Sequence, residues 1–217
     1  MKNLLYKEFK LSFYPQCIIF LIFGFMMIIP NYPYIVGYLY VFVTAVYIFG
    51  LGRENNDIYY SCLLPVTKKD VVKARIILIM ILEVVNALIC IGFSYLGGLF
   101  LPKMESPYMA GMPANYALAG IGLFISGIFN LLFFPMFYKT GYKTTKAFLV
   151  SYISTFLLGV LLYYLEMIPD LKEIFHFSIY ENILPQIGVL GVGIVSFLVF
   201  TYVSYRISIK RFDKVDL

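Results

Sequence analysis

The feature that most constrains this chain is a set of long apolar runs that carry almost no charge. From Leu11 to Gly52 no residue is charged, and the tetrapeptide Pro-Asn-Tyr-Pro at 30–33 interrupts the middle. Each half has about 20 residues, which is the length that an α-helix needs to cross the hydrocarbon core of a bilayer. The stretch therefore predicts a hairpin of two membrane-spanning helices.

Four further apolar runs follow, and Glu83 is the one charged residue within them. Of the 217 residues, 61% are hydrophobic and 13% are charged, whereas about 25% are charged in a typical soluble domain. This composition excludes an ordinary cytosolic globule, a disordered chain and a secreted disulfide scaffold. We predict an all-α integral membrane protein whose residues 1–217 form a single transmembrane domain. The six expected spans are 14–29, 33–51, 76–100, 116–137, 147–165 and 184–205.

The basic residues predict how these spans are oriented. Cytoplasmic loops of membrane proteins carry an excess of Lys and Arg. All but two of the 17 Lys and Arg residues fall on one side of the expected spans, and the exceptions are Lys103 and Lys172. We therefore expect both termini in the cytoplasm. The high usage of Ile, Lys, Tyr and Asn is typical of an AT-rich bacterium, so the expected location is a bacterial plasma membrane.

The N-terminal residues precede the first span and have an amphipathic pattern. Leu5, Phe9 and Phe13 repeat every four residues, while the lysines lie off that stripe. This pattern favours a short helix lying in the membrane interface. A simple basic run-in to the first span is the alternative.

The segment between the second and third spans is the most informative part of the chain. Asp57 can cap a short helix that Pro65 ends. Thr67 and Asp70 then have the spacing of a capping box, which begins a new helix that leads into the third span. The short helix carries more apolar surface than a free loop should show, so either the membrane interface or a cytoplasmic partner should cover it. Its large apolar residues are Tyr59, Tyr60, Leu63 and Leu64.

This segment resembles the one that follows the second span in small ABC-2 type transporter permeases. The resemblance rests on the sequence LLPVTKKDVVKAR at residues 63–75, with acidic and Asn residues before it and a long span after it. The sequence LLYKEFK at residues 4–10 and the layout of six spans also match that family. The motif covers about 25 residues, and the layout covers the whole chain.

The resemblance implies a permease whose short cytoplasmic helix docks into a groove of a separate ABC ATPase. ATP and Mg would then bind to that partner, and this chain would hold no cofactor. A second permease copy, identical or similar, would complete a homo- or heterodimer. Membrane lipids would surround the spans, and no nucleic-acid partner is expected. Carried onto this sequence, the ATPase-coupling residues are Glu54, Asn56, Asp57, Tyr59, Tyr60, Leu63, Leu64 and Pro65.

The residues give no sign of an enzyme. A phosphate-binding loop of the P-loop type requires a Gly-Lys pair, and the chain contains none. His176 is the single histidine, and no second ligand lies at a useful spacing for a metal. We therefore expect neither a catalytic residue nor a metal site here, and we expect ATP hydrolysis in a partner subunit.

We single out three of the polar side chains within the expected spans: Glu83, Asn86 and Asn130. A charge inside a bilayer is costly and marks either an aqueous path or a partner. Glu83 could act in gating or substrate passage, or it could pair with a Lys or Arg of a neighbouring helix. Small residues at helical spacing predict close helix packing instead. They are Gly122 and Ser126 on the fourth span, Ser151, Thr155 and Gly159 on the fifth, and Gly188, Gly191 and Gly193 on the sixth.

The expected function is the permease subunit of an ABC-2 type exporter, which forms the substrate pathway. Spans with few charges and many Phe and Tyr suit an amphipathic or hydrophobic substrate such as a peptide. The alternative is a stand-alone small secondary transporter or channel that uses Glu83. A third class is a structural or immunity-type membrane protein without a transport cycle.

Overall fold

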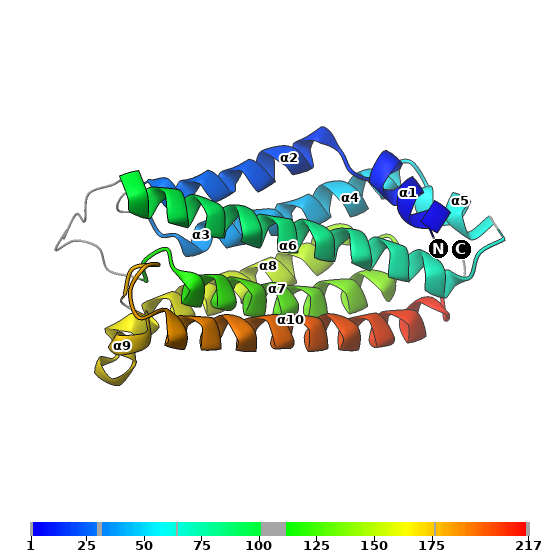
Figure 1. Cartoon of the computed structure of the whole chain (residues 1–217). Helices are drawn as coiled ribbons and strands as arrows, with labels where there is room; N and C mark the ends of the chain where they lie inside the picture. Colours follow the sequence, from blue (N-terminus) through cyan, green and yellow to red (C-terminus); the bar gives the residue numbers. More distant parts are fainter. Residues whose placement is uncertain (1, 30–31, 64, 101–111, 176, 216–217) are drawn as a thin grey trace.

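The computed structural model describes residues 2–29, 32–63, 65–100, 112–175 and 177–215. Within these ranges every regular element is a helix. The long helices lie side by side along one direction, with α1 (Lys2–Leu11), α5 (Asp57–Leu63) and the end of α10 (Ile183–Phe212) at one end of the bundle (Figure 1). The short helix α9 (Lys172–Phe175) lies at the opposite end. The chain is thus an all-α integral membrane protein.

Five helical stretches are long and apolar enough to cross a membrane. The first, Ile35–Glu54, comprises α3 (Ile35–Leu39), η2 (Tyr40–Phe42) and α4 (Val43–Glu54). The others are α6 (Lys68–Phe100), α7 (Tyr116–Tyr138), α8 (Thr144–Tyr163) and α10.

A sixth span is present if the N-terminal helices are counted together. The helix α2 (Pro15–Ile22) continues into η1 (Phe23–Ile28), and α1 is bent away from this pair by 79°. The apolar part, Pro15–Ile28, is shorter than a helix that crosses the whole membrane, which needs about 20 residues. The turn expected at 30–33 lies partly outside the described residues, since 30 and 31 are not among them.

The helix α1 packs one face against the bundle. Leu4, Glu8 and Ser12 are buried, whereas Phe9 remains 40% exposed. Of the apolar stripe, Phe9 therefore faces away from the bundle, whereas Phe13 packs partly against its core. A polar carboxylate at Glu8 lies on the buried face instead.

Aromatic stacking joins α4 and η2 to α7. The rings of Phe42 and Phe129 stack with centroids 4.3 Å apart, and Phe49 meets Phe137 edge-on at 4.5 Å. Such pairs add about 0.5–1.5 kcal/mol each beyond the area that they bury. The fully buried Phe133 contacts both Phe49 and Phe129, so the cluster is continuous along α7.

Glycines allow α7 and α10 to approach closely. A Cβ added to Gly193 would overlap the carbonyl group of Gly120, and one added to Gly120 would lie 2.6 Å from the carbonyl oxygen of Val189. Gly188 and Gly191, by contrast, would meet nothing within 4 Å. Of the three glycines that the sequence singles out on this helix, Gly193 alone lies at the contact.

Two amide side chains organise the end of the bundle near α9. Asn115 accepts a hydrogen bond from the backbone N–H of Leu118 at 2.9 Å and so caps α7. Its Nδ2 donates to the carbonyls of Phe175 and Phe177 at 3.0 and 2.9 Å. Gln186 donates likewise to two carbonyls of the loop before α10. The sequence predicts that Lys103 lies at this non-cytoplasmic end. Both Lys103 and His176 lie outside the described residues.

Replacing Gly193 with Ala should destabilise the bundle, because the new Cβ would force the α7 and α10 backbones apart. Overpacking of this kind costs roughly 1–3 kcal/mol. We expect a clear fall in the apparent melting temperature of the detergent-purified protein, followed by size-exclusion chromatography after heating. The matched variant Gly191→Ala lies on the same helix in open space and should melt no lower than wild type. Equal losses in both variants would contradict the packing described here.

Candidate functional site

The short helix α5 is set off from α4 by a sharp change of chain direction. Asn56 adopts a left-handed backbone conformation with φ of 51°, which Asn tolerates better than most residues. Its carbonyl then accepts a hydrogen bond from the N–H of Tyr60 at 3.0 Å. Pro65 is exposed beyond the end of the helix, and Leu64 lies outside the described residues.

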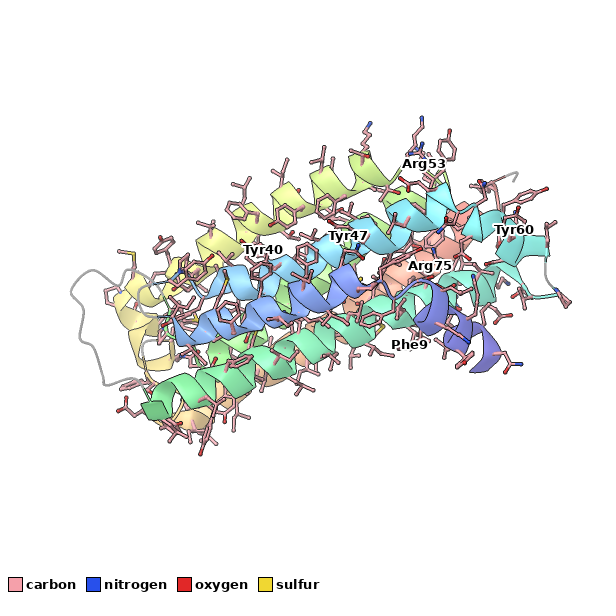
Figure 2. All side chains as sticks on the ribbon, turned by 90° about the horizontal axis from the view of Figure 1, so that it is seen from above. Phe9, Tyr40, Tyr47, Arg53, Tyr60 and Arg75 are labelled. Carbon is pink, nitrogen blue, oxygen red and sulfur yellow. The ribbon has the colours of Figure 1, made fainter. Side chains whose placement is uncertain are left out.

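The two faces of α5 differ in exposure. Ile58 and Ser61 are buried against the bundle. Tyr59, Tyr60 and Leu63 are 49%, 61% and 65% exposed, and they form what we call the α5 outer face. Figure 2 shows Tyr60 at the extreme end of the molecule. An exposed group of large apolar side chains marks a surface that either the membrane interface or a partner covers.

Asp57 does not belong to the α5 outer face. Its carboxylate pairs with Lys7 at 2.5 Å and with the guanidinium of Arg75. Burial by itself raises the pKa of Asp57, but the charge of Arg75 and the hydrogen bond from Lys7 outweigh it, so the pKa lies below its ordinary value. Glu54 and Asn56, the remaining predicted coupling residues, are both exposed before α5.

Arg75 is the centre of the contacts that hold α5 in place. Its Nε donates to Glu8 Oε2 at 2.8 Å, and its Nη2 donates to Glu8 Oε1 at 3.2 Å and to Ser12 Oγ at 3.4 Å. The same Nη2 reaches Asp57. The Arg75 side chain is 1% exposed, and its guanidinium lies 5.5 Å from the ring centre of Phe49. One residue of α6 thus contacts α1, α4 and α5 (Figure 2).

Lys7 completes this group, which we call the Arg75 cluster: Lys7, Glu8, Ser12, Asp57, Ser61 and Arg75. Lys7 donates to Ser61 Oγ at 2.6 Å, and Ser61 in turn donates to the carbonyl of Asp57 at 2.6 Å. Two positive and two negative charges meet, so the cluster is neutral overall. Buried charges persist in proteins when they are paired in this way.

The sequence does not predict the Arg75 cluster. Glu8 and Arg75 are 67 residues apart, and each is one of several charges in a basic segment next to a span. The excess of basic residues in that segment predicts the orientation of the spans, but it does not distinguish Arg75, which is fully buried, from the exposed basic residues. The residues Thr67 and Asp70 behave locally as their spacing predicts: the N–H of Asp70 donates to Thr67 Oγ1 at 3.2 Å at the start of α6.

A second polar group lies in the middle of the bundle. Asn130 of α7 donates from Nδ2 to Glu83 Oε2 at 2.7 Å and to Thr201 Oγ1 at 3.1 Å. Ser204 donates to the Asn130 carbonyl at 2.5 Å. Helices α6, α7 and α10 are therefore joined through Asn130. Asn86, one turn after Glu83, bonds instead to the carbonyl of Gly37 at 3.3 Å.

The partner of Glu83 differs from one expectation of the sequence. Glu83 is 2% exposed and forms none of the ion pairs found among the described residues. Its bonded partner is the neutral amide of Asn130 rather than a Lys or Arg. Asn130 itself lies on a face with Gly122 and Ser126 that the sequence assigns to packing alone. The link between Glu83 and Asn130 is visible only in three dimensions.

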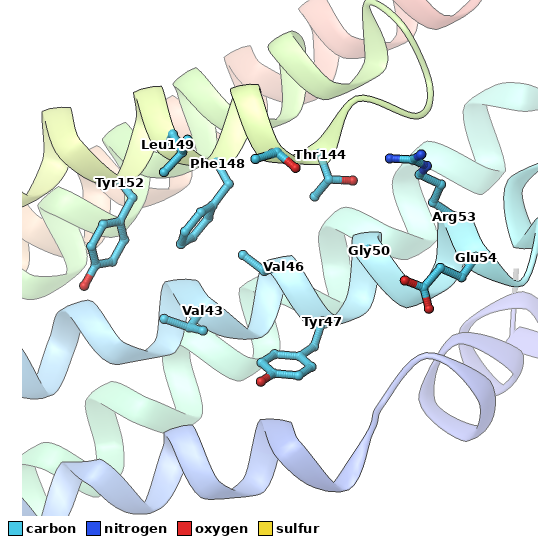
Figure 3. A pocket seen from close by; sticks show the side chains of 11 residues that line it. Val43, Val46, Tyr47, Gly50, Arg53, Glu54, Thr144, Phe148, Leu149 and Tyr152 are labelled. Carbon is cyan, nitrogen blue, oxygen red and sulfur yellow. The ribbon is translucent and has the colours of Figure 1, made fainter.

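A cleft of about 710 Å³ opens between α4 and α8. Figure 3 shows its walls, with Val43 and Val46 on one side and Phe148 and Tyr152 on the other. Arg53 and Thr144 lie at the end nearest α5 (Figure 3). Among the described residues no group of three or more His, Cys, Asp and Glu is placed to hold a metal ion.

Comparison with known families gives a match over almost the whole chain. A family model described as "ABC-2 family transporter protein" matches residues 3–213. The matched range begins in α1 and ends just after α10, so it includes α5, the Arg75 cluster and the cleft. No curated protein and no solved structure matches the chain significantly.

Removing the guanidinium of Arg75 should destabilise the protein strongly. The variant Arg75→Met leaves the buried Glu8 carboxylate without its partner, and breaking a buried pair costs about 3–5 kcal/mol. We expect a large fall in apparent melting temperature in detergent. Lys73→Met removes an exposed charge from the same helix and should change it little. If the double variant Glu8→Gln/Arg75→Met loses the full sum of the two single losses, the two residues are not coupled as described.

Replacing the Asn130 side chain should also lower the stability of the bundle. Asn130→Leu leaves Glu83 without its donor, and an interhelical hydrogen bond in a membrane contributes about 1 kcal/mol. Replacing both partners, as Glu83→Met/Asn130→Leu, removes the unpaired group and should restore part of the lost stability. The apparent melting temperatures of wild type, Asn130→Leu and the double variant in detergent measure these changes in stability. A double variant less stable than Asn130→Leu alone would contradict it.

Proposed function

Because the chain belongs to the ABC-2 family of transporter proteins, we propose that it is the permease of an exporter driven by a separate ABC ATPase. It is a multi-pass membrane protein of permease type. The observation that carries the rest is α5, a short helix whose inner face is bound to the bundle and whose outer face is apolar and exposed. The α5 outer face is the surface that the ATPase would cover.

The orientation follows from the distribution of charge along the bundle. The end that contains α1, α5 and the end of α10 also contains most of the Lys and Arg residues. By the positive-inside rule this end faces the cytoplasm, where an ATPase has access to ATP. ATP and Mg would bind to that partner. The membrane would be a bacterial plasma membrane.

The Arg75 cluster supports a route from the ATPase to the spans. A displacement of α5 moves Asp57, and Asp57 is paired with Arg75 of α6. Arg75 is bonded in turn to Glu8 of α1. We propose that α1, α5 and the first part of α6 move as one unit when the ATPase closes. This motion would switch the spans between inward-open and outward-open states.

The substrate pathway would form with a second permease copy, in a homo- or heterodimer. The outward faces of α8 and α10 are apolar, as lipid or another copy requires, with Leu157, Leu161, Val192, Val195 and Tyr202 all at least half exposed. An amphipathic or hydrophobic substrate, such as a peptide, suits walls of this composition.

Charging the α5 outer face should abolish capture of the ATPase. We expect the tagged wild-type chain to co-purify in detergent with a co-expressed candidate ABC ATPase, and Tyr60→Asp/Leu63→Asp to lose most of it. Both side chains are exposed, so the fold should survive. Tyr142→Asp, which charges an exposed tyrosine in the loop between α7 and α8, should still capture the ATPase.

Two results would contradict this proposal in different ways. A wild-type chain that captures no ATPase argues against the exporter. A double variant that captures it normally retains the exporter but excludes the α5 outer face as the docking surface. Unchanged elution of each variant in size-exclusion chromatography shows that the loss is not one of folding.

A further inference from the structure

We propose that the cleft between α4 and α8 holds an anionic phospholipid of the cytoplasmic leaflet, with its phosphate between Arg53 and the start of α8. This inference rests on the proposed orientation, which places this end of the bundle at the cytoplasmic surface. It concerns a bound lipid and is separate from the docking of the ATPase at α5. The argument starts from the two ends of the cleft, which differ in chemistry.

The deep part of the cleft is apolar. Its walls are Val43, Val46 and Tyr47 from α4, with Phe148 and Leu149 from α8. From Gly50 back to Val43 the cleft follows α4 for about 10 Å at the rise of an α-helix. An acyl chain fits such walls, since both are apolar and the residues that line the cleft come from α4 and α8 alone. A free inorganic anion would gain nothing from them.

The mouth of the cleft is polar and carries a positive charge. In Figure 3 the guanidinium of Arg53 and the hydroxyl of Thr144 extend toward one another from opposite walls. Arg53 forms none of the ion pairs found among the described residues. Arginine matches phosphate geometry better than any other side chain, because its donors form a planar fork.

Thr144 supplies a second and independent observation. Its side chain is 5% exposed, and its Oγ1 has no hydrogen-bond partner among the described residues. A buried hydroxyl without a partner is costly, and a phosphate oxygen in the mouth would accept a hydrogen bond from it. Thr144 is also the first residue of the 20-residue helix α8, and Lys143 before it provides no side-chain cap. The N–H of Thr144 donates to the carbonyl of Tyr142 at 3.1 Å, but the next N–H groups of the first turn and the dipole of that helix end favour an anion.

The carboxylate of Glu54 also lines the cleft, and its negative charge would oppose an anion if it lay beside Thr144. Glu54 follows Arg53 directly, and Figure 3 shows its carboxylate extending away from Thr144. Two exposed lysines, Lys143 and Lys146, flank the start of α8. The region around Thr144 therefore stays positive, as an anionic headgroup requires.

The test measures which lipid stays on the protein. The full-length permease, without ATPase, is reconstituted in nanodiscs of equimolar phosphatidylglycerol and phosphatidylcholine, extracted with mild detergent, and its retained lipid is identified by native mass spectrometry. We expect wild type to retain phosphatidylglycerol. Arg53→Gln and Thr144→Val should each retain it about tenfold less, as loss of one hydrogen bond to a charged group predicts. Arg53→Lys should retain an intermediate amount.

The control variant is Arg206→Gln, which removes an exposed positive charge from α10, away from the cleft. It should retain lipid as wild type does. Equal retention of the two lipids by wild type, or equal losses in Arg53→Gln and Arg206→Gln, would overturn the proposal. So would displacement of the lipid by inorganic phosphate at equal concentration, which would indicate a site for free anions. Because the ATPase is absent from this experiment, its outcome is independent of docking at α5.

Discussion

The buried guanidinium of Arg75 is the interaction on which the cytoplasmic end of this bundle depends. A charge that is 1% exposed has lost its water, and the cost is offset only when charged partners surround it. Those partners, Glu8 and Asp57, come from two short helices that bury little apolar surface of their own. Ion pairs to α6 therefore help to set the positions of α1 and α5, together with the buried side chains of Leu4 and Ile58.

This arrangement explains how α5 can present apolar residues outward. An isolated helix of its length would not be stable in water. With Asp57 and Ser61 held in the Arg75 cluster, Tyr59, Tyr60 and Leu63 are not needed for packing and remain free for a partner. The coupling role proposed for α5 and its attachment to the spans thus rest on opposite faces of the same short helix.

The middle of the bundle is held together differently. Gly120 and Gly193 bring α7 and α10 into backbone contact, and Asn130 bonds both to Glu83 of α6 and to Thr201 of α10. The bond to Asn130 makes Glu83 part of the packing between these helices. Its second oxygen, Oε1, is buried and has no hydrogen-bond partner among the described residues. What moves in the proposed cycle would be the α1–α5–α6 unit relative to this region.

The sequence by itself determined the class of the protein and its family. Uncharged runs of about 20 residues can do little else than cross a membrane, and the family expected from residues 63–75 is confirmed by the match to residues 3–213. The short helix before Pro65 and the start of α6 at Thr67 were also predictable, because capping and proline act within a few residues.

Tertiary structure alone decided which polar residues meet. The sequence singled out Asp57 as an ATPase-coupling residue, whereas in the structure its carboxylate is paired with Arg75 and Lys7. It also treated Arg53 and Arg75 as equal members of a basic segment, although one lines an open cleft and the other is fully buried. Charge and periodicity describe a residue's surroundings along the chain. Burial and pairing depend on helices that are distant in sequence, and no local pattern specifies which of them will lie alongside.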